Sequence, residues 1–275
     1  MTRTFDLSSR TDHPAPLDVI ADLHRRAGEL GLRWVLIGAA ARDLVVHLPS
    51  GHPVVRATND VDIAIAVEGR QQFLKFTEGF ASVRGPEHKV LVRGVEVDIV
   101  PFGGIESGDR VTFADGHELA VVGLREAAAA PDTVILPHGL RIPVASIEAQ
   151  SALKTLAWRD RHFDTSKDAT DLLELLMAGS QGPYADELWP DEEALAINEF
   201  DASLAGAWRI GRGAGRLFDL KRGNHVLDVL NDPHQHQLLR RDMRSILAAG
   251  LLTAYQAGFR AGPSATPTPS ETDNH

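Results

Sequence analysis

The chain of 275 residues contains no cysteine. That absence excludes disulfides, thiolate metal sites and a cysteine nucleophile. The sequence also has no run of 18 or more apolar residues, so we expect no membrane-spanning segment. Its first six residues lack an apolar core and do not resemble a signal peptide. These absences make the cytoplasm the expected location.

Positive charge is scarce overall but unevenly distributed. The net charge is −10. Between Ala205 and Gly262, however, nine Lys/Arg stand against four Asp, a local excess of +5. A basic stretch on an acidic chain is typical of a phosphate-binding face, although a solvated helix surface gives the same pattern. We therefore expect any contact with an RNA backbone to lie within residues 209–244.

Hydrophobic periodicity divides the chain into four segments. Residues 1–16 are polar and are predicted to be a flexible lead-in, and the Pro-rich tail 263–275 is predicted to be disordered. Residues 17–145 are predicted to form helices at 17–30, 39–47 and 71–80, and strands at 34–37, from Asp60 to Val67, and at 89–92 and 95–100, where Pro101 ends the last strand. Residues 146–262 are predicted to be helical, at 146–160, 167–177, 192–204 and 235–257. The order predicts an α+β fold, a mixed-sheet core followed by a helical C-terminal half.

Two acids, Asp60 and Asp62, open a strand that is otherwise apolar. Side chains alternate across a strand, so both carboxylates point to one face with backbones roughly 6–7 Å apart. Paired carboxylates repel unless a cation lies between them, and Mg²⁺ takes one or two carboxylates together with phosphates. Two solvated acids at a strand edge are the alternative, but the apolar run that follows favours a metal site.

A third acid, Asp98, interrupts the apolar strand Val97–Val100. A carboxylate in such a strand is costly to bury without a partner. If its strand lies beside the first acid strand, Asp98 completes a three-carboxylate metal site with Asp60 and Asp62, and it can also accept a proton from an attacking hydroxyl. Glu96 lies on the same face and is the competing candidate.

Two further features are candidates for binding phosphate. The turn Gly38-Ala39 joins a strand to a helix whose first turn carries Arg42, and such turns let backbone amides approach an anion. Lys154 shares a helical face with Arg161, and Asp168 and Asp171 share a face of the next helix. A tightly packed turn and a surface lattice of ion pairs are the structural alternatives.

Taken in order, these motifs resemble the nucleotidyltransferase toxins of the AbiEii/MenT group, type IV toxin–antitoxin toxins of the DNA polymerase β-like superfamily. The resemblance covers about residues 30–180. The matching residues are Gly38-Ala39, Arg56-x-Thr58-x-Asp60-x-Asp62, Val97 to Gly103, Lys154-x-x-Ala157-Trp158-x-x-Arg161 and Lys167-Asp168-x-x-Asp171-Leu172. The superfamily usually has Gly-Ser or Gly-Gly at the first turn, so Ala39 removes a hydroxyl contact to phosphate.

The resemblance implies a polymerase β-like core and Mg²⁺-dependent transfer of NMP from an NTP, with release of pyrophosphate. The catalytic residues it implies are Asp60, Asp62, Asp98, Lys154 and Asp168, and the nucleotide-binding residues are Gly38, Ala39, Arg42, Arg56, Thr58 and Lys154. It also implies an RNA acceptor, the 3′ end of tRNA, and a toxin role with a cognate antitoxin. CCA addition, transfer to a small molecule or a protein, and a degenerate non-catalytic binding module remain as alternatives.

Overall fold

A mixed eight-stranded sheet dominates the N-terminal half of the computed structural model, which describes residues 2–53, 60–83 and 85–262. Its order is β1-β9-β10-β2-β3-β6-β5-β4. The strands are β1 (Thr4–Asp6), β2 (Trp34–Ile37), β3 (Asp60–Val67), β4 (Ala81–Ser82), β5 (Lys89–Val92), β6 (Val95–Gly103), β9 (Asp132–Ile135) and β10 (Arg141–Val144). A separate hairpin pairs β7 (Arg110–Thr112) with β8 (Glu118–Ala120).

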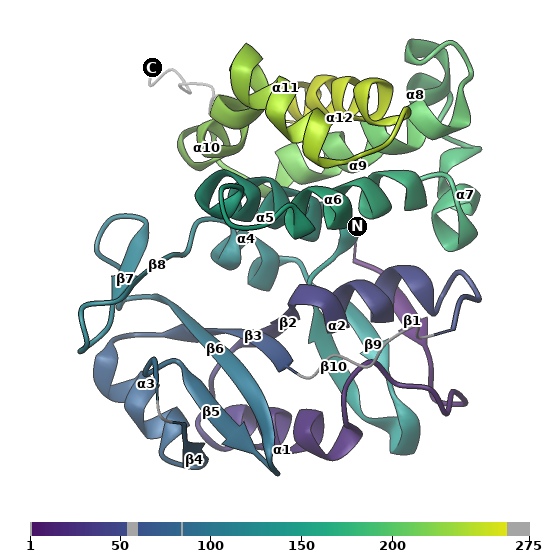
Figure 1. Ribbon diagram of the computed structural model, residues 1–275. Helices are drawn as coiled ribbons and strands as arrows, with labels where there is room; N and C mark the ends of the chain where they lie inside the picture. The colour runs from purple at the N-terminus through teal and green to yellow at the C-terminus, as the bar shows by residue number, and fades with distance from the viewer. Residues whose placement is uncertain (1, 54–59, 84, 263–275) are drawn as a thin grey trace, which may run out of the picture.

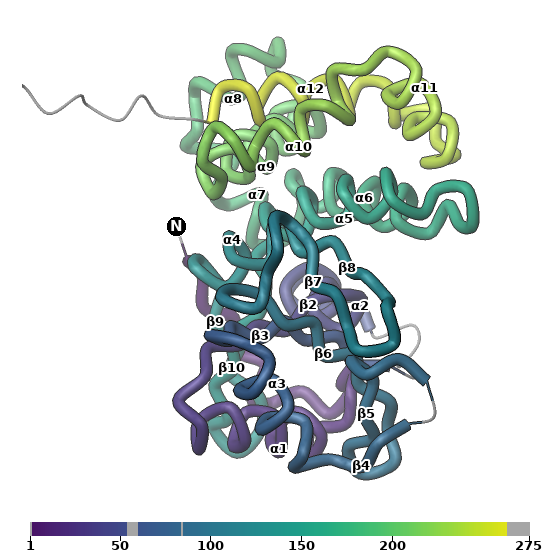
Figure 2. The backbone as a smooth tube through the Cα atoms, turned by 90° about the vertical axis from the view of Figure 1, so that its left-hand side faces the viewer, coloured from purple at the N-terminus to yellow at the C-terminus, as the bar shows by residue number. Residues whose placement is uncertain are grey.

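Helices cover both faces of the sheet and build a second layer above it (Figures 1 and 2). Helices α1 and α3 lie on the far face, whereas α2 and α4 lie toward the helical half, where α5 and α6 come next and α9 to α12 lie beyond them. The first group is α1 (Leu17–Glu29), α2 (Gly38–Arg42), the π-helical turn η1 (Asp43–His47), α3 (Arg70–Thr77), α4 (Leu124–Ala129) and the short η2 (Pro137–Gly139). The second group is α5 (Ile147–Arg161), α6 (Lys167–Ala178), α7 (Gly182–Leu188), α8 (Glu192–Ile197), α9 (Ala202–Leu217), α10 (Leu220–Asn231), α11 (Pro233–Asp242) and α12 (Ala248–Ala261). No helix among the described residues has the length and apolar character needed to cross a membrane.

The centre of the sheet brings the predicted acid strands together. β3 runs parallel to β6, and Asp62 is the register partner of Asp98. On its other side β3 is antiparallel to β2, so that Asp62 also lies opposite Ile37 and next to the turn at Gly38. The predicted α+β class is therefore confirmed, with the acids and the Gly38 turn at one edge of three central strands.

Some predicted element boundaries were wrong. β6 does not end at Pro101 but continues to Gly103, because β5 pairs with β6 only as far as Asp98. Beyond the bond from Ile99 N–H to His88 O, no described strand pairs with this edge of β6, so the missing N–H of proline costs no ladder bond there. The predicted helices at 192–204 and 235–257 are each broken by a turn, and α9 and α10 extend over segments with no predicted helix.

Helix α9 escaped prediction because it is rich in glycine. A Cβ at Gly211 would lie 2.1 Å from the backbone oxygen of Tyr255, and one at Gly258 would lie 2.0 Å from that of Trp208. The glycines lower helix propensity but allow α9 and α12 to pack backbone against backbone. The helical half is therefore built around a contact that larger side chains would prevent.

The predicted flexible lead-in at residues 1–16 was also wrong, since this segment is part of the sheet. β1 pairs in parallel with β9, and Phe5 and Leu7 are buried in the core. The tail 263–275 lies outside the described residues.

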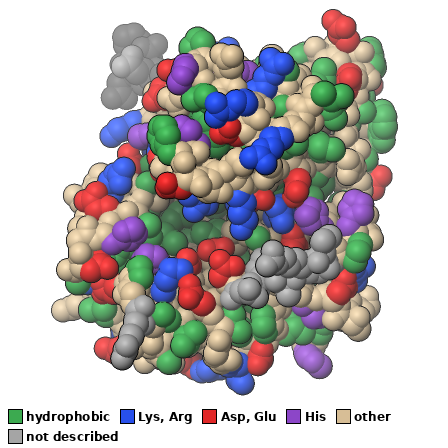
Figure 3. Space-filling view, viewed as in Figure 1, with side chains coloured by type: hydrophobic (Ala, Val, Ile, Leu, Met, Phe, Trp, Pro, Cys, Tyr) green, Lys and Arg blue, Asp and Glu red, His purple; other side chains and the backbone are tan. Residues whose placement is uncertain are grey.

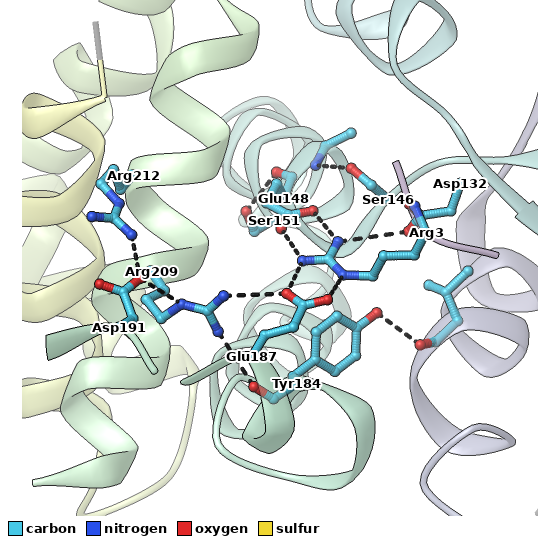
Figure 4. A network of polar contacts seen from close by, with 12 residues as sticks. Arg3, Asp132, Ser146, Glu148, Ser151, Tyr184, Glu187, Asp191, Arg209 and Arg212 are labelled. Carbon is cyan, nitrogen blue, oxygen red and sulfur yellow. Dashed lines mark hydrogen bonds and ion pairs between the residues drawn. The ribbon is translucent and has the colours of Figure 1, made fainter. Parts of the chain in front are cut away.

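An ion network centred on Arg3 fastens this first strand to the helical half (Figure 4). The Arg3 guanidinium donates to Glu148 on α5 at 2.8 Å and to Glu187 on α7 at 2.7 Å. Its backbone N–H donates to Asp132 Oδ1 on β9 at 2.7 Å. Arg209 on α9 extends the network by contacting Glu187 at 3.2 Å. Arg3 and its partners therefore connect β1 and β9 of the sheet to the helices α5, α7 and α9.

Carboxylates outnumber cations around Arg3, so one of them is forced toward its neutral form. Burial raises the pKa of Asp132 to about 7, opposed by the hydrogen bond from Arg3 and reinforced by the charge of Glu148. A folded-state pKa above the unfolded value means that the native protein binds the extra proton. The associated stability is present below about pH 4 and is lost as the pH rises through 7.

We predict that Asp132→Asn removes this pH dependence while keeping an oxygen that accepts from Arg3. The free energy of unfolding of the variant, relative to the parent, should rise by about 2–4 kcal/mol between pH 5 and pH 8. Denaturant melts at several pH values measure this difference. Asp186→Asn, at an exposed position on α7, is the control for loss of one carboxylate, and a parallel rise in that control would contradict the assignment to Asp132.

Candidate active site

A cavity of about 470 Å³ separates the acid edge of the sheet from the ends of α5 and α6. The sheet contributes Asp60, Asp62 and Asp98, together with the Gly38-Ala39 turn. The helical side contributes Lys154, Arg159, Arg161, Lys167 and Asp168. Figure 3 shows the hollow, with Lys and Arg side chains above it and Asp and Glu side chains below. Opposite charges therefore face each other across an open space.

Asp62 is at the centre of the acidic wall and bears most of its repulsion. Burial, followed by the charges of Asp98 and Asp60, raises the pKa of Asp62 to about 6, while Lys154 and Lys167 act in the opposite direction. A carboxylate held this way gains from any cation placed among the three acids. The ionised Asp62 carboxylate would therefore be stabilised by a bound cation.

Asp98, rather than Glu96, is the third acid of the cavity. Lys89 on β5 pairs with both carboxylates, at 2.8 Å to Asp98 Oδ1 and 2.5 Å to Glu96 Oε1. Of these two acids only Asp98 lines the cavity, where it lies beside its register partner Asp62. Lys89 therefore neutralises part of the acidic wall from behind.

Gly38 is required by the position of Asp62. Its φ is +74°, and a Cβ built on it would lie 2.1 Å from Asp62 Oδ2. The turn therefore presses the backbone of α2 against the carboxylate. Any side chain at position 38 would displace Asp62 from the cavity.

On the opposite wall, Asp168 organises two cations. Lys154 Nζ lies 3.0 Å from Asp168 Oδ1, and Arg161 donates twice to the same carboxylate, at 2.6 and 2.8 Å. Burial alone would raise the pKa of Asp168, but the hydrogen bond from Arg161 and the charge of Lys154 hold it below its usual value. Asp168 is fully buried and remains ionised, so it positions Lys154 and Arg161 at the cavity.

Arg42 is placed in the same network but not among the residues that line the cavity. Its guanidinium lies 2.5 Å from Asp171 Oδ1 and 3.0 Å from Glu174 Oε2. Asp171 in turn accepts from Lys154 at 2.5 Å. In this structure Arg42 therefore links α2 to α6, and its expected contact with phosphate stays a prediction. Arg56 and Thr58 lie outside the described residues.

The cavity includes residues beyond the predicted catalytic and nucleotide-binding sets. Arg159, Arg161 and Lys167 add to its cationic wall, and the helical spacing of Lys154 and Arg161 was the available signal. His88 lines the acidic side and is 6% exposed, and burial lowers its pKa. An apolar surface completes the lining, formed by Val100, Leu119, Ala120, Val122, Leu124, Leu153 and Leu156. No local pattern marks these residues, because the β7–β8 hairpin is brought to the cavity only by tertiary packing.

The acidic wall offers carboxylate oxygens as metal ligands, and their arrangement limits the kind of metal site that they can form. Within the described residues no group of three or more His, Cys, Asp or Glu side chains is arranged to hold a metal by itself. Mg²⁺ sites in phosphoryl-transfer enzymes use one or two carboxylates and complete their coordination with substrate phosphates and water. The carboxylates here, with Asp62 destabilised by its acidic neighbours, fit a cation that binds together with a phosphate ligand and do not fit an all-protein cage.

Half of the basic residues in segment 209–244 form internal ion pairs. Arg209 and Arg212 both contact Asp191, and Arg222 lies 2.8 Å from Glu126. These side chains hold α9 and α10 in place and are not free to bind a phosphate backbone. The expectation that an RNA backbone contacts residues 209–244 stays a prediction.

Comparison with known proteins gives a limited result. No protein-family model and no curated protein sequence matches the chain. Among solved structures, it is similar to the antibiotic-resistance factor ANT(2'')-Ia, with 15% identity, 66% of this chain and 93% of the other covered, and a TM-score of 0.35. It is also similar to an antigenic nucleotidyltransferase-like protein from Paracoccidioides brasiliensis, with 17% identity, 68% and 91% covered, and a TM-score of 0.34.

We predict that Gly38→Ala is destabilising for two separable reasons. The positive φ costs about 1–2 kcal/mol for an L-residue, and the clash with Asp62 adds to it. Gly51→Ala is the matched control, since Gly51 has φ +79° with nothing within 4 Å of its added Cβ. Chemical denaturation should show the larger loss for Gly38→Ala, and a double-mutant cycle with Asp62→Ala should recover part of it. Equal losses at both glycines would contradict the close packing on Asp62.

We also predict that Asp62→Asn stabilises the protein in the absence of metal. Because the folded-state pKa of about 6 exceeds the ordinary value of 3.8, the charged form is penalised above about pH 6. At pH 8 the variant should gain about 1–3 kcal/mol in free energy of unfolding, and at pH 4 the gain should vanish. Asp60→Asn, at an exposed position, serves as the control and should gain less.

Proposed function

We propose that this chain is an NTP-dependent nucleotidyltransferase that moves NMP to an acceptor hydroxyl and releases pyrophosphate. The observation that carries the proposal is the cavity itself, in which three carboxylates face Lys154, Arg161 and Lys167. A nucleoside triphosphate has the matching chemistry, because its phosphates can bridge a cation on the acidic wall and the basic groups opposite.

The side chains divide the work of this reaction. Lys154 and Arg161, held by Asp168, bind the β- and γ-phosphates and stabilise the charge that develops on the departing pyrophosphate. The acceptor oxygen forms a bond to the α-phosphorus while the bond from the α-phosphorus to the bridging oxygen breaks. The proton of the acceptor hydroxyl passes to the acidic wall, where Asp98 lies beside Asp62.

Asp60, Asp62 and Asp98 would hold Mg²⁺ at this wall. When bound, the metal supplies positive charge to phosphate oxygens that the carboxylates would otherwise repel. The raised pKa of Asp62 supports this assignment, because the same repulsion that favours its protonation favours a bound cation. The apolar lining from Leu119 to Leu124 and from Leu153 to Leu156 is suited to the base and sugar of the nucleotide.

For the acceptor we propose an RNA, specifically the 3′ end of tRNA, and for the biological role a toxin that a cognate antitoxin restrains. These finer assignments are supported by the ordered motifs from Gly38 to Asp171. A small-molecule or protein acceptor and a non-catalytic role are the competing hypotheses, and a labelling assay with defined acceptors separates them.

We predict that the protein, supplied with Mg²⁺ and one of the four α-labelled NTPs, transfers label to tRNA. Asp62→Asn and Lys154→Gln should each lower the rate by roughly 100-fold or more, through loss of charge stabilisation in the transition state. Asp186→Asn should retain full activity, since its position on α7 is outside the cavity. Label on a protein or an aminoglycoside in place of tRNA would overturn the RNA acceptor, and label on no acceptor at all would overturn the enzymatic function.

A further inference from the structure

A basic cluster lies at the end of α11, formed by Arg240, Arg241 and Arg244. These side chains border a surface depression of about 380 Å³ with Gln237 and Ser245. Arg241 is 3.0 Å from its neighbour Asp242, but Arg240 and Arg244 form no ion pair within the described part of the chain. Two unneutralised guanidinium groups therefore lie close together on the surface.

The cluster contrasts with the rest of its segment. Arg209, Arg212 and Arg222 are neutralised by acids of neighbouring helices. The chain as a whole has a net charge of −10, so an anionic partner depends on local groups of cations that are not paired with acids. Arg240 and Arg244, in contrast, are exposed and close together at this turn.

A stack of rings connects the basic cluster to the neighbouring turn. Trp158 Nε1 donates to Asp242 Oδ2 at 3.0 Å, which joins α5 to the end of α11. The Trp158 ring stacks on His162 with centroids 4.6 Å apart, and His162 lies 3.9 Å from Phe163. The outermost ring, Phe163, is 88% exposed. Such a ring has one supported face and one that is open to a planar ligand.

Phe163 is close in sequence to residues that line the cavity. It lies in the turn between α5 and α6, with Arg161 before it and Thr165 and Lys167 after it, all of which line the cavity. Figure 2 shows this turn directly below the turn between α11 and α12, on one side of the molecule. Cations and an exposed ring therefore lie on two neighbouring turns, one of which leads into residues that line the cavity.

We propose that this surface binds a single-stranded nucleic acid whose end enters the cavity as the acceptor. Arg240 and Arg244 contact backbone phosphates, and Phe163 stacks on an unpaired base. A groove that combines basic groups with an open aromatic face is the usual chemistry of single-strand binding. The binding surface is independent of catalysis, and only its role in presenting the acceptor rests on the proposed nucleotidyltransferase function.

The test compares three fluorescent probes on the full chain without NTP: a short unstructured RNA, DNA of the same sequence, and inorganic polyphosphate, which has charge but no bases. Phe163→Ala should weaken oligonucleotide binding roughly 5- to 100-fold and leave polyphosphate binding unchanged. Arg240→Gln combined with Arg244→Gln should weaken binding of all three probes. The same double variant should also lower the slope of log affinity against log salt concentration for the oligonucleotides, by about 0.7 for each phosphate that is no longer neutralised.

Matched controls come from the same half of the molecule. Phe200→Ala removes another exposed ring, at 75% exposure, and Arg216→Gln combined with Lys221→Gln removes two exposed charges elsewhere. Both should bind the probes like the parent. Equal losses in the controls, or unchanged oligonucleotide affinity in the test variants, would overturn the proposal, as would Phe163→Ala weakening polyphosphate as much as RNA.

The outcome is separable from that of the proposed function. Loss of binding in the test variants, with no nucleotide transfer by the parent protein, would support the surface and overturn the function. Transfer to RNA by the parent, with unchanged binding and rate in the test variants, would support the function and overturn the surface. A preference for RNA over DNA would assign the strand to RNA.

Discussion

Repulsion among the carboxylates of Asp60, Asp62 and Asp98 is the constraint on which the site depends. Parallel pairing of β3 with β6 places Asp62 directly beside Asp98, and no choice of rotamer removes their mutual field. The protein keeps this arrangement although burial and repulsion raise the pKa of Asp62 to about 6. Such an unfavourable group of buried carboxylates in a well-packed sheet is typical of a functional site, where a positively charged ligand relieves the repulsion.

The remaining charges are arranged so that they do not cancel that repulsion internally. Lys89 reaches only Asp98 and Glu96, from outside the cavity. Lys154 and Arg161 are held on the opposite wall by Asp168, with Asp171 and Arg42 behind them. An acidic wall with uncancelled repulsion thus faces a basic wall across a gap, and this separation is what allows a ligand with its own positive and negative parts to be recognised.

Part of this arrangement could be predicted because it is local. Asp60, Asp62 and Asp98 could be found from two-residue alternation within apolar strands, and Gly38 from its place between a strand and a helix. That β3 and β6 are neighbours could only be assumed, because strand order depends on the whole sheet and not on local sequence. The ion pair of Arg42 with Asp171 could not be predicted, because the carboxylates that surround a cation depend on which helix packs opposite it. Here that helix is α6, which brings Asp171.

The N-terminal strand and α9 escaped prediction for a related reason, namely that tertiary contacts override local propensity. β1 has three residues, too few for periodicity, and it is fixed by contacts from Arg3 to residues 129 to 184 positions away. Those contacts join β9 of the sheet to α5, and α5 carries Lys154 and Arg161. The distance between the acidic and basic walls therefore depends on a clamp at the opposite end of α5. Ordered packing at the beginning of the chain is thus part of what sets the geometry of the cavity.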